Sequence, residues 1–270
     1  MRNDYDIIVI GGGHAGAEAA WAASRLGASV ALITLDPVRV GQMSCNPAIG
    51  GLAKGQMVRE IDALGGLMGR AIDNTGIQFR MLNRSKGPAV WGPRAQADKY
   101  KYAIEVQRLL STCPNLDVVP GEVADIETSG TGVSPVHGRD AHATVKAVTL
   151  ANGDRLTCRA VIVTTGTFLR ALMHTGEQKT EGGRVGEASA RGLSGCLARL
   201  GLELGRLKTG TPPRLDRKTI DFAKFEIQPG DDEPSPFSFL NEYDNDTWRP
   251  PLTQTHCWIG ATNAAIHDVI

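Results

Sequence analysis

The sequence predicts an α/β fold built around a parallel β-sheet. Three observations predict it: an apolar run at residues 5–10, an alanine-rich helical stretch at 14–27, and a second apolar run at 29–34. Isoleucine and valine dominate the two runs, as they do in strands that are buried on both faces. Together the three segments make a β-α-β unit of about thirty residues.

Glycines join the first predicted strand to the helix in a G-x-G-x-x-G pattern. The motif consists of Gly11, Gly12, Gly13, His14, Ala15 and Gly16. The first glycine permits a tight turn, Gly13 lets the backbone approach a pyrophosphate, and Gly16 lets the helix pack close to the strand. His14 contributes its backbone N–H rather than its imidazole. Because the motif follows a strand and opens a helix, it predicts a Rossmann-like dinucleotide site at the helix N-terminus.

The carboxylate that usually binds the adenosine ribose is displaced or replaced. It is expected at the end of the second strand, about twenty residues after the glycines. Thr34 occupies that place, and Asp36 follows two residues later. The sequence therefore does not identify the residue that binds the adenosine ribose.

The segment 36–93 interrupts the alternation of strands and helices. It is rich in glycine, has helical periodicity at 57–64, and is interpreted as a long insertion that lies over a ligand site. A helix is predicted over 94–112 and a third strand over 115–121.

Alternating runs at 122–128, 142–150 and 154–160 predict an antiparallel β-meander over 122–158, with a tight turn at Asn152-Gly153. A buried strand at 160–168 then returns to the main sheet. The sequence therefore predicts a first domain at 1–168 and a second, partial domain of mixed α/β structure at 169–270.

A β-meander between a β-α-β unit and a strand that ends in Thr-Gly resembles the FAD-binding domain of the two-dinucleotide-domain flavoproteins. The resemblance implies that Thr164, Thr165 and Gly166 pass near the nucleotide, with Val123 as a further contact.

Composition excludes several classes of protein. The five cysteines form no C-x-x-C pair, so neither a disulfide framework nor a zinc site is indicated, and a reducing cytoplasm is expected. No signal peptide is recognised, and no apolar run approaches the ~18 residues of a membrane span.

Charge is unevenly spread although the formal net charge is +0. Residues 39–101 hold ten Lys and Arg against four Asp and Glu, and residues 220–246 hold one against eight. The pattern is compatible with a polyanionic partner, but a solvated surface explains it as well. The candidates for phosphate contacts, to nucleic acid or to FAD, are Arg80, Arg84, Lys86, Arg94, Lys99 and Lys101.

Cys45 lies in a glycine-rich loop after the second strand. A reactive thiolate needs electropositive neighbours, which Lys54 and Arg59 would supply. From the residues alone, a small buried thiol that packs as a hydrophobe is the simpler interpretation.

Four further blocks carry a specific resemblance to one family. They are "GQMSCNPAIGG" (41–51), "DALGGLMGRAIDNTGIQFRMLNRSKGPAVWGPRAQAD" (62–98), "RLKTGTPPRL" (206–215) and "THCWIGATNAAIHDVI" (255–270). They resemble the MnmG (GidA) family of tRNA uridine 5-carboxymethylaminomethyl modification enzymes. The resemblance implies FAD, NADH as reductant, methylene-tetrahydrofolate as co-substrate, a tRNA substrate modified at C5 of the wobble uridine, the GTPase MnmE as partner, and a homodimer of the full-length enzyme. It also implies that Cys45 attacks C6 of the uridine or protonates an adduct.

The resemblance leaves two alternatives. Members of the family are longer, so the chain is interpreted as an N-terminal fragment, and a flavin-binding fragment without turnover is one alternative. The other is the related folate-dependent tRNA uridine methyltransferase, which is not associated with the block around Cys45. Glu181 occupies a position where the family has a small polar FAD contact, so it is included among the cofactor-binding candidates.

Overall fold

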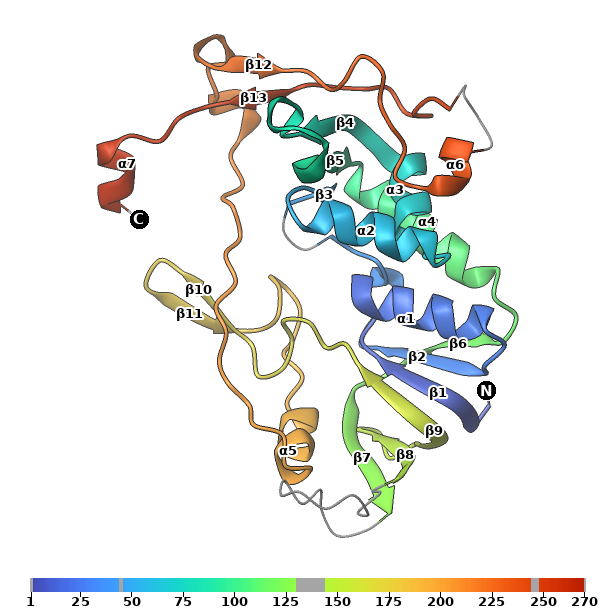
Figure 1. Cartoon of the computed structure of the whole chain (residues 1–270). Coiled ribbons are helices and arrows are strands. Elements are labelled where there is room, and N and C mark those ends of the chain that lie inside the picture. The colour runs from blue at the N-terminus through green and yellow to red at the C-terminus, as the bar shows by residue number, and fades with distance from the viewer. Residues whose placement is uncertain (1, 44–45, 130–143, 244–247, 270) are drawn as a thin grey trace. The chain divides into compact units, whose positions relative to one another are not determined.

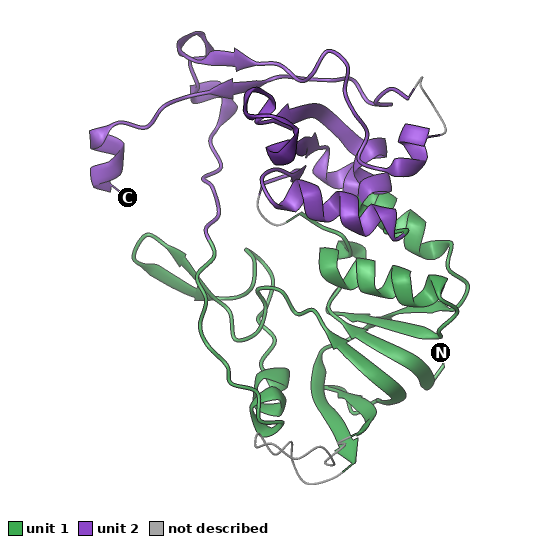
Figure 2. Cartoon of the chain, viewed as in Figure 1, with its two compact units in different colours: residues 1–44, 65–68, 103–209 green, residues 45–64, 69–102, 210–270 purple. Residues whose placement is uncertain are grey.

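The computed structural model describes residues 2–43, 46–129, 144–243 and 248–269. The chain forms two compact units whose segments alternate along the sequence (Figure 2). Unit 1 comprises residues 1–44, 65–68 and 103–209, and unit 2 comprises residues 45–64, 69–102 and 210–270.

Unit 1 is built on a six-stranded sheet with the order β6-β2-β1-β9-β8-β7 (Figure 1). Its strands are β1 (Asp4–Ile10), β2 (Val30–Thr34), β6 (Leu116–Pro120), β7 (Val123–Ser129), β8 (Thr144–Leu150) and β9 (Arg155–Val163). The first four strands of that order are mutually parallel, whereas β8 and β7 continue the sheet as an antiparallel meander. The predicted α/β class with a parallel-dominated sheet is confirmed.

One strand serves where the sequence predicts two. Runs at 154–160 and 160–168 are expected as separate strands, but β9 is continuous. Its first residues, 155–157, pair with β8 in antiparallel fashion, while residues 157–163 pair with β1 in parallel. Because a strand has two hydrogen-bonding edges, one segment both closes the meander and extends the parallel sheet.

Helix α1 (His14–Arg25) forms because alanine is abundant in it, and it ends where the sequence predicts. Gly27 adopts φ +93°, which is the left-handed conformation favoured by glycine. The N–H groups of Gly27 and Ala28 donate to the carbonyls of Ser24 and Ala23, at 3.0 and 3.2 Å. This is a Schellman motif, so the predicted role of Gly27 in closing the helix is confirmed. Helix α1 contacts β1, β2 and β9.

Helix α4 (Lys99–Ser111) is shorter than the predicted helix over 94–112, because residues 92–97 form strand β5 instead. Asp98 sets the start of the helix, since its side chain accepts hydrogen bonds from the N–H groups of Tyr100 and Lys101 at 3.1 and 3.2 Å. With 13 residues, α4 is the longest helix of the described chain, and no helix in those ranges is long and apolar enough to cross a membrane.

The segment after β9 belongs to unit 1. It holds the hairpin β10 (Leu172–Thr175) and β11 (Gln178–Glu181), and helix α5 (Gly192–Arg199). Helix α5 contacts β7, and its buried Leu193, Cys196 and Leu197 join the hydrophobic core under the sheet. Residues 169–209 therefore pack with the preceding sheet in unit 1. The division into domains at residues 168 and 169 stays a prediction about independently folding parts.

Unit 2 contains a three-stranded antiparallel sheet of order β3-β5-β4 and a two-stranded sheet of β12 and β13. Its strands are β3 (Ala48–Gly50), β4 (Gly76–Leu82), β5 (Gly92–Ala97), β12 (Glu226–Gln228) and β13 (Cys257–Ile259). Its helices are α2 (Lys54–Ala63), most of α3 (Met68–Thr75), the start of α4, α6 (Phe239–Tyr243) and α7 (Ala264–Val269).

Two buried carboxylates in unit 2 hold the segment that leads into α6. Asp73 is fully buried and accepts hydrogen bonds from the N–H groups of Phe237 and Ser238, at 2.7 and 2.9 Å. Asp62, also buried, accepts from the N–H of Phe239 at 2.7 Å. Burial raises the pKa of Asp73 to about 6, and the hydrogen bonds from the backbone oppose that shift.

Stability is predicted to depend on pH through Asp73. Because the pKa of Asp73 is higher in the folded than in the unfolded chain, the folded protein binds more protons between about pH 4 and 6. The penalty for burying the charge is therefore present at neutral pH and falls as the pH drops through 6.

We expect wild type to gain roughly 1 to 1.5 kcal/mol relative to Asp73→Asn on going from pH 7.5 to pH 5. Asparagine fills the same space but does not titrate. Urea unfolding of both proteins at the two pH values measures the difference in free energy of unfolding. A difference that is the same at both pH values would contradict this role of Asp73.

Candidate nucleotide-binding site

A cavity of about 260 Å³ lies in unit 1 where the parallel strands end. Its walls come from the residues that follow β1, β2, β6 and β9, together with the segment between β11 and α5. In open α/β sheets, ligands bind in the crevice outside the carboxyl ends of the strands. The position of the cavity is therefore the one that the glycine motif predicts.

The glycine turn brings β1, β9 and α1 into backbone contact. Gly11 has φ +109°, and a Cβ atom added to it would lie 2.3 Å from the carbonyl oxygen of Thr164. A Cβ atom on Gly16 would lie 1.7 Å from the carbonyl oxygen of Gly11. Any larger residue at either position would force the helix away from the strands, so both positions require glycine for packing.

Gly13 differs from these two glycines. It is the N-cap residue of α1 with an ordinary φ of −74°, and an added Cβ atom would meet no described atom within 4 Å. Among the described residues, no side chain caps this helix N-terminus and the first turn holds no acidic residue. The positive end of the helix thus faces a space that protein atoms do not fill, and this space suits the phosphates of a dinucleotide.

The structure brings together most of the cofactor-binding residues predicted from the sequence. Those that line the cavity are Gly11, Gly12, Gly13, His14, Val123, Thr165 and Gly166. Ala15 and Gly16 lie in the first turn of α1, and Glu181 lies exposed at the end of β11, where it pairs with Arg191. None of these last three is among the residues that line the cavity. Cys45 lies outside the described residues, and all of these role assignments stay predictions.

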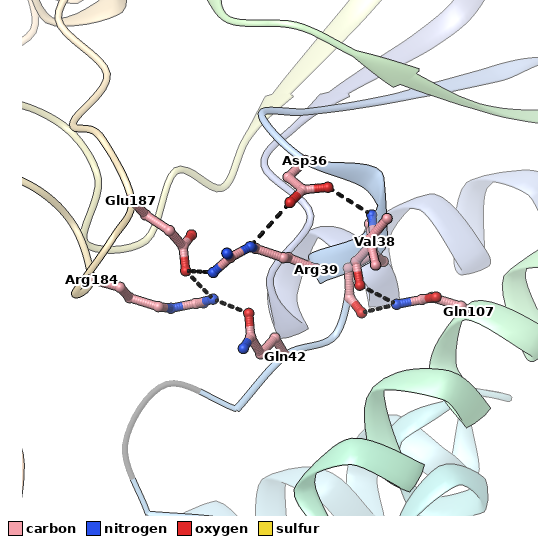
Figure 3. Close-up of polar contacts among 8 residues, drawn as sticks. Asp36, Val38, Arg39, Gln42, Gln107, Arg184 and Glu187 are labelled. Carbon is pink, nitrogen blue, oxygen red and sulfur yellow. Dashed lines mark hydrogen bonds and ion pairs between the residues drawn. The ribbon is translucent and has the colours of Figure 1, made fainter.

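Sequence reasoning missed a network of charged groups on the cavity wall (Figure 3). The carboxylate of Glu187 accepts hydrogen bonds from Arg39 at 2.6 Å and from Arg184 at 3.4 Å. Arg184 also donates to Gln42 at 2.9 Å. The negative charge of Glu187 is the main reason that the pKa of Arg39 is raised. Asp36, Arg39, Gln42, Arg184 and Glu187 all line the cavity.

A tight turn orients Arg184 and Glu187, the two members of this network that lie between β11 and α5. The N–H of Glu187 donates to the carbonyl of Arg184 at 3.0 Å, and Gly186 has φ +78°. This tight turn sets the two side chains side by side, and the guanidinium of Arg184 lies over the ring of Phe168 at 5.3 Å. The letters "RVGE" indicate a turn, but nothing local indicates that it meets a loop almost 150 residues away.

Asp36 lines the cavity, but both of its carboxylate oxygens already accept hydrogen bonds from neighbouring residues. One of its oxygens accepts from the N–H of Val38 at 3.0 Å, which caps the short helix η1 (Pro37–Arg39). The other accepts from Nε of Arg39, also at 3.0 Å. Gln107 on α4 holds the same loop by donating to the carbonyls of Val38 and Val40. Asp36 is the carboxylate that lies nearest in sequence to the expected ribose-binding position, and both of its oxygens already accept hydrogen bonds.

None of the described cysteines is among the residues that line the cavity. Burial raises the pKa of Cys158 and of Cys196 to about 11, so both stay protonated at neutral pH. Cys113 is buried, and Cys257 is partly buried with its thiol donating to Gln78 at 3.2 Å. Within the described residues, no group of His, Cys, Asp and Glu could hold a metal ion.

The candidate phosphate-binding cations lie in unit 2, several of them on the β4–β5 hairpin. Arg80 donates to the carbonyl of Pro229 at 2.8 Å, and Arg84 pairs with Asp231 at 3.1 Å. Lys86 is exposed at the tip of the hairpin, and Arg94 lies in β5 opposite Arg80. Lys99 and Lys101 are exposed in the first turn of α4. Cationic side chains therefore share one hairpin, although two of them are already held by carbonyl or carboxylate oxygens.

Arg59 is also engaged within unit 2. It donates to the carbonyls of Pro236 and Phe237, each at 3.1 Å, and pairs with Glu242 at 2.6 Å. Lys54 donates to the carbonyl of Ala48 at 3.4 Å. The predicted electrostatic support of Cys45 by these two cations stays a prediction.

Comparison with known proteins identifies relatives along the whole chain. The profile of the family described as glucose inhibited division protein A matches residues 6–270. The chain is 54% identical over 269 residues to the tRNA uridine 5-carboxymethylaminomethyl modification enzyme MnmG of Rhodopirellula baltica, covering 100% of this chain and 40% of that protein. It is 52% identical over 266 residues to the protein of the same name from Granulibacter bethesdensis, covering 98% and 40%.

A solved structure shares the fold as well. GidA from Aquifex aeolicus superposes with a TM-score of 0.84 at 48% identity, and the match covers 95% of this chain and 41% of that one. The chain thus spans about 40% of the length of these relatives. On this evidence the chain belongs to the glucose inhibited division protein A (GidA) family.

Proposed function

We propose that the cavity of unit 1 binds FAD. The observation that carries the proposal is the open space at Gly13, which adjoins an uncapped helix N-terminus at the carboxyl ends of parallel strands. Gly11, Gly12, Gly13, His14, Ala15 and Gly16 would hold the diphosphate, and Val123, Thr165 and Gly166 would contact the nucleotide. Glu181 would be a further cofactor contact, because the family resemblance implies a cofactor contact at its position. The flavin would supply electron transfer between NADH and the folate-derived carbon.

The whole protein is proposed to act on tRNA, because the curated relatives carry the name of a tRNA uridine modification enzyme. With NADH, methylene-tetrahydrofolate and the GTPase MnmE, it would add an aminomethyl or carboxymethylaminomethyl group at C5 of the wobble uridine. The full-length enzyme would be a cytoplasmic homodimer, and this chain would be its cofactor-binding part. Cys45 would act directly on the uridine.

The first prediction separates cofactor binding from folding. Wild type should purify yellow or take up FAD, whereas Gly13→Ala should weaken FAD binding by about tenfold or more, because a methyl group would enter the space that the phosphates need. Quenching of flavin fluorescence measures the affinity, and thermal unfolding should be almost unchanged.

Gly16→Ala is the matched control for packing. The same methyl group would overlap the carbonyl oxygen of Gly11, so this variant should lose stability even without FAD. If Gly13→Ala bound FAD as wild type does, the diphosphate would not lie at this turn. A wild type that neither purifies with FAD nor takes it up would remove the proposed cofactor.

The second prediction concerns Cys45. If the wild-type chain turns over tRNA with NADH and methylene-tetrahydrofolate, Cys45→Ala should abolish the modification and leave FAD binding intact. Cys257→Ala is the control, since its thiol already donates to Gln78. Analysis of modified nucleosides by mass spectrometry measures the product. Wild-type turnover by Cys45→Ala would exclude a catalytic role, and a wild-type chain that binds FAD without turnover would be a cofactor-binding module.

The third prediction concerns tRNA binding. The double reversal Arg84→Glu, Lys86→Glu should weaken binding by about tenfold or more at low salt and reduce its salt dependence, because phosphate contacts release counterions. Lys146→Glu, Arg159→Glu makes the same change of charge on exposed residues of unit 1 and should have little effect. Filter binding of tRNA at two salt concentrations measures both. Equal affinities for wild type and the first double variant would remove the hairpin from the tRNA site.

A further inference from the structure

We propose that Glu187 accepts hydrogen bonds from the hydroxyl groups of the adenosine ribose, in place of the carboxylate that is missing at the end of β2. The inference rests on the proposed binding of FAD in this cavity. It assigns a cofactor contact to the turn between β11 and α5, far in sequence from the glycine motif.

Three carboxylates line the cavity: Asp36, Glu122 and Glu187. Asp36 follows β2 most closely, but both of its oxygens already accept hydrogen bonds, from Val38 and Arg39. Glu122 accepts from the N–H of Arg191, which directs it toward the start of α5. A ribose-binding carboxylate must be held beside the loop that follows β2, and it must have an oxygen without a hydrogen-bond partner. Neither Asp36 nor Glu122 meets both conditions.

Glu187 meets both conditions. Its Oε1 atom takes both guanidinium contacts, and its Oε2 atom makes no hydrogen bond with any residue in the described ranges (Figure 3). Its side chain is only 14% exposed, so the two arginines hold the free oxygen in one place. A carboxylate with a fixed and unoccupied oxygen is suited to accept from a hydroxyl donor.

Arg39 places this carboxylate where the ribose is expected. Arg39 is bound to Asp36, two residues beyond the end of β2, and the same guanidinium holds Glu187 at 2.6 Å. The ribose of a dinucleotide lies beside the end of the second strand of the β-α-β unit. Arg39 and Arg184 are therefore positioning residues, which compensate the charge of Glu187 and hold it at the cavity wall through its other oxygen.

The charge balance of the cluster sets which ribose it accepts. Asp36 and Glu187 carry two negative charges, and Arg39 and Arg184 carry two positive charges, so the cluster has no excess positive charge. A phosphorylated ribose needs an uncompensated cation, whereas a free diol needs an acceptor. The cluster therefore suits a ribose with free hydroxyls.

The test compares two nucleotides that differ only in these hydroxyls. ADP and 2′,3′-dideoxy-ADP are titrated against the full chain freed of flavin, and FAD is titrated in parallel by fluorescence. In wild type we expect ADP to bind about tenfold more tightly than the dideoxy compound. In Glu187→Gln this ratio should fall to about 1 to 3, because ADP alone loses affinity, and FAD should weaken as ADP does.

Substitutions of other carboxylates in unit 1 serve as controls for Glu187→Gln. Glu127→Gln removes a carboxylate of unit 1 that also pairs with an arginine but lies away from the cavity, and it should bind like wild type. Asp36→Asn and Glu122→Gln should keep the ratio between ADP and dideoxy-ADP, even if both affinities shift together. Thermal unfolding of each variant confirms that it is folded.

Several outcomes would overturn the inference. Equal weakening of ADP and dideoxy-ADP in Glu187→Gln would mean that Glu187 only braces the cavity wall. Loss of the ratio in Asp36→Asn or Glu122→Gln, but not in Glu187→Gln, would assign the ribose to another carboxylate. Weaker FAD with unchanged ADP would place Glu187 at the flavin half. A wild type without affinity for FAD or ADP would overturn the proposed cofactor as well, whereas each of the other outcomes leaves FAD binding standing.

Discussion

The site in unit 1 depends on one close approach, between the backbone of Gly11 and the backbones of Thr164 and Gly16. At these points there is no room for a side-chain carbon, so the first strand, the crossover helix and the last parallel strand converge within van der Waals contact. The Oγ1 atom of Thr164 reinforces the junction by donating to the carbonyls of Ile10 and Gly11, at 2.9 and 3.1 Å. This convergence aims the N-terminus of α1 at the cavity and sets the direction from which a diphosphate can be held.

Charged side chains form part of the cavity wall, together with the backbone of the glycine turn. Glu187 binds two arginines, one from the loop after β2 and one from its own turn, and Gln42 of the same loop binds the second arginine. Partly buried ion pairs with several hydrogen bonds hold side chains in place more effectively than isolated pairs on the surface. The network therefore makes a turn that is remote in sequence part of the cavity wall.

Unit 2 uses a comparable device for a structural purpose. Asp73 and Asp62 satisfy the N–H groups that open α6, and Arg59 binds the carbonyls just before it while its guanidinium lies 3.8 Å from the centre of the Phe239 ring. An irregular segment becomes ordered because its polar backbone groups find side-chain partners inside the unit. The cost of burying Asp73 appears as its raised pKa.

The sequence by itself determined the β-α-β unit, the glycine turn, the end of α1 at Gly27 and the meander, because those features depend on local conformation and on hydrophobic periodicity. It also determined the family, through blocks of adjacent residues. The tertiary structure decided that β9 is one strand, that residues 92–97 pair as β5 before α4 begins at Lys99, and that Glu187 meets Arg39. Pairing partners and ion pairs between residues far apart in the chain depend on which edges and walls come together, and no local pattern encodes that.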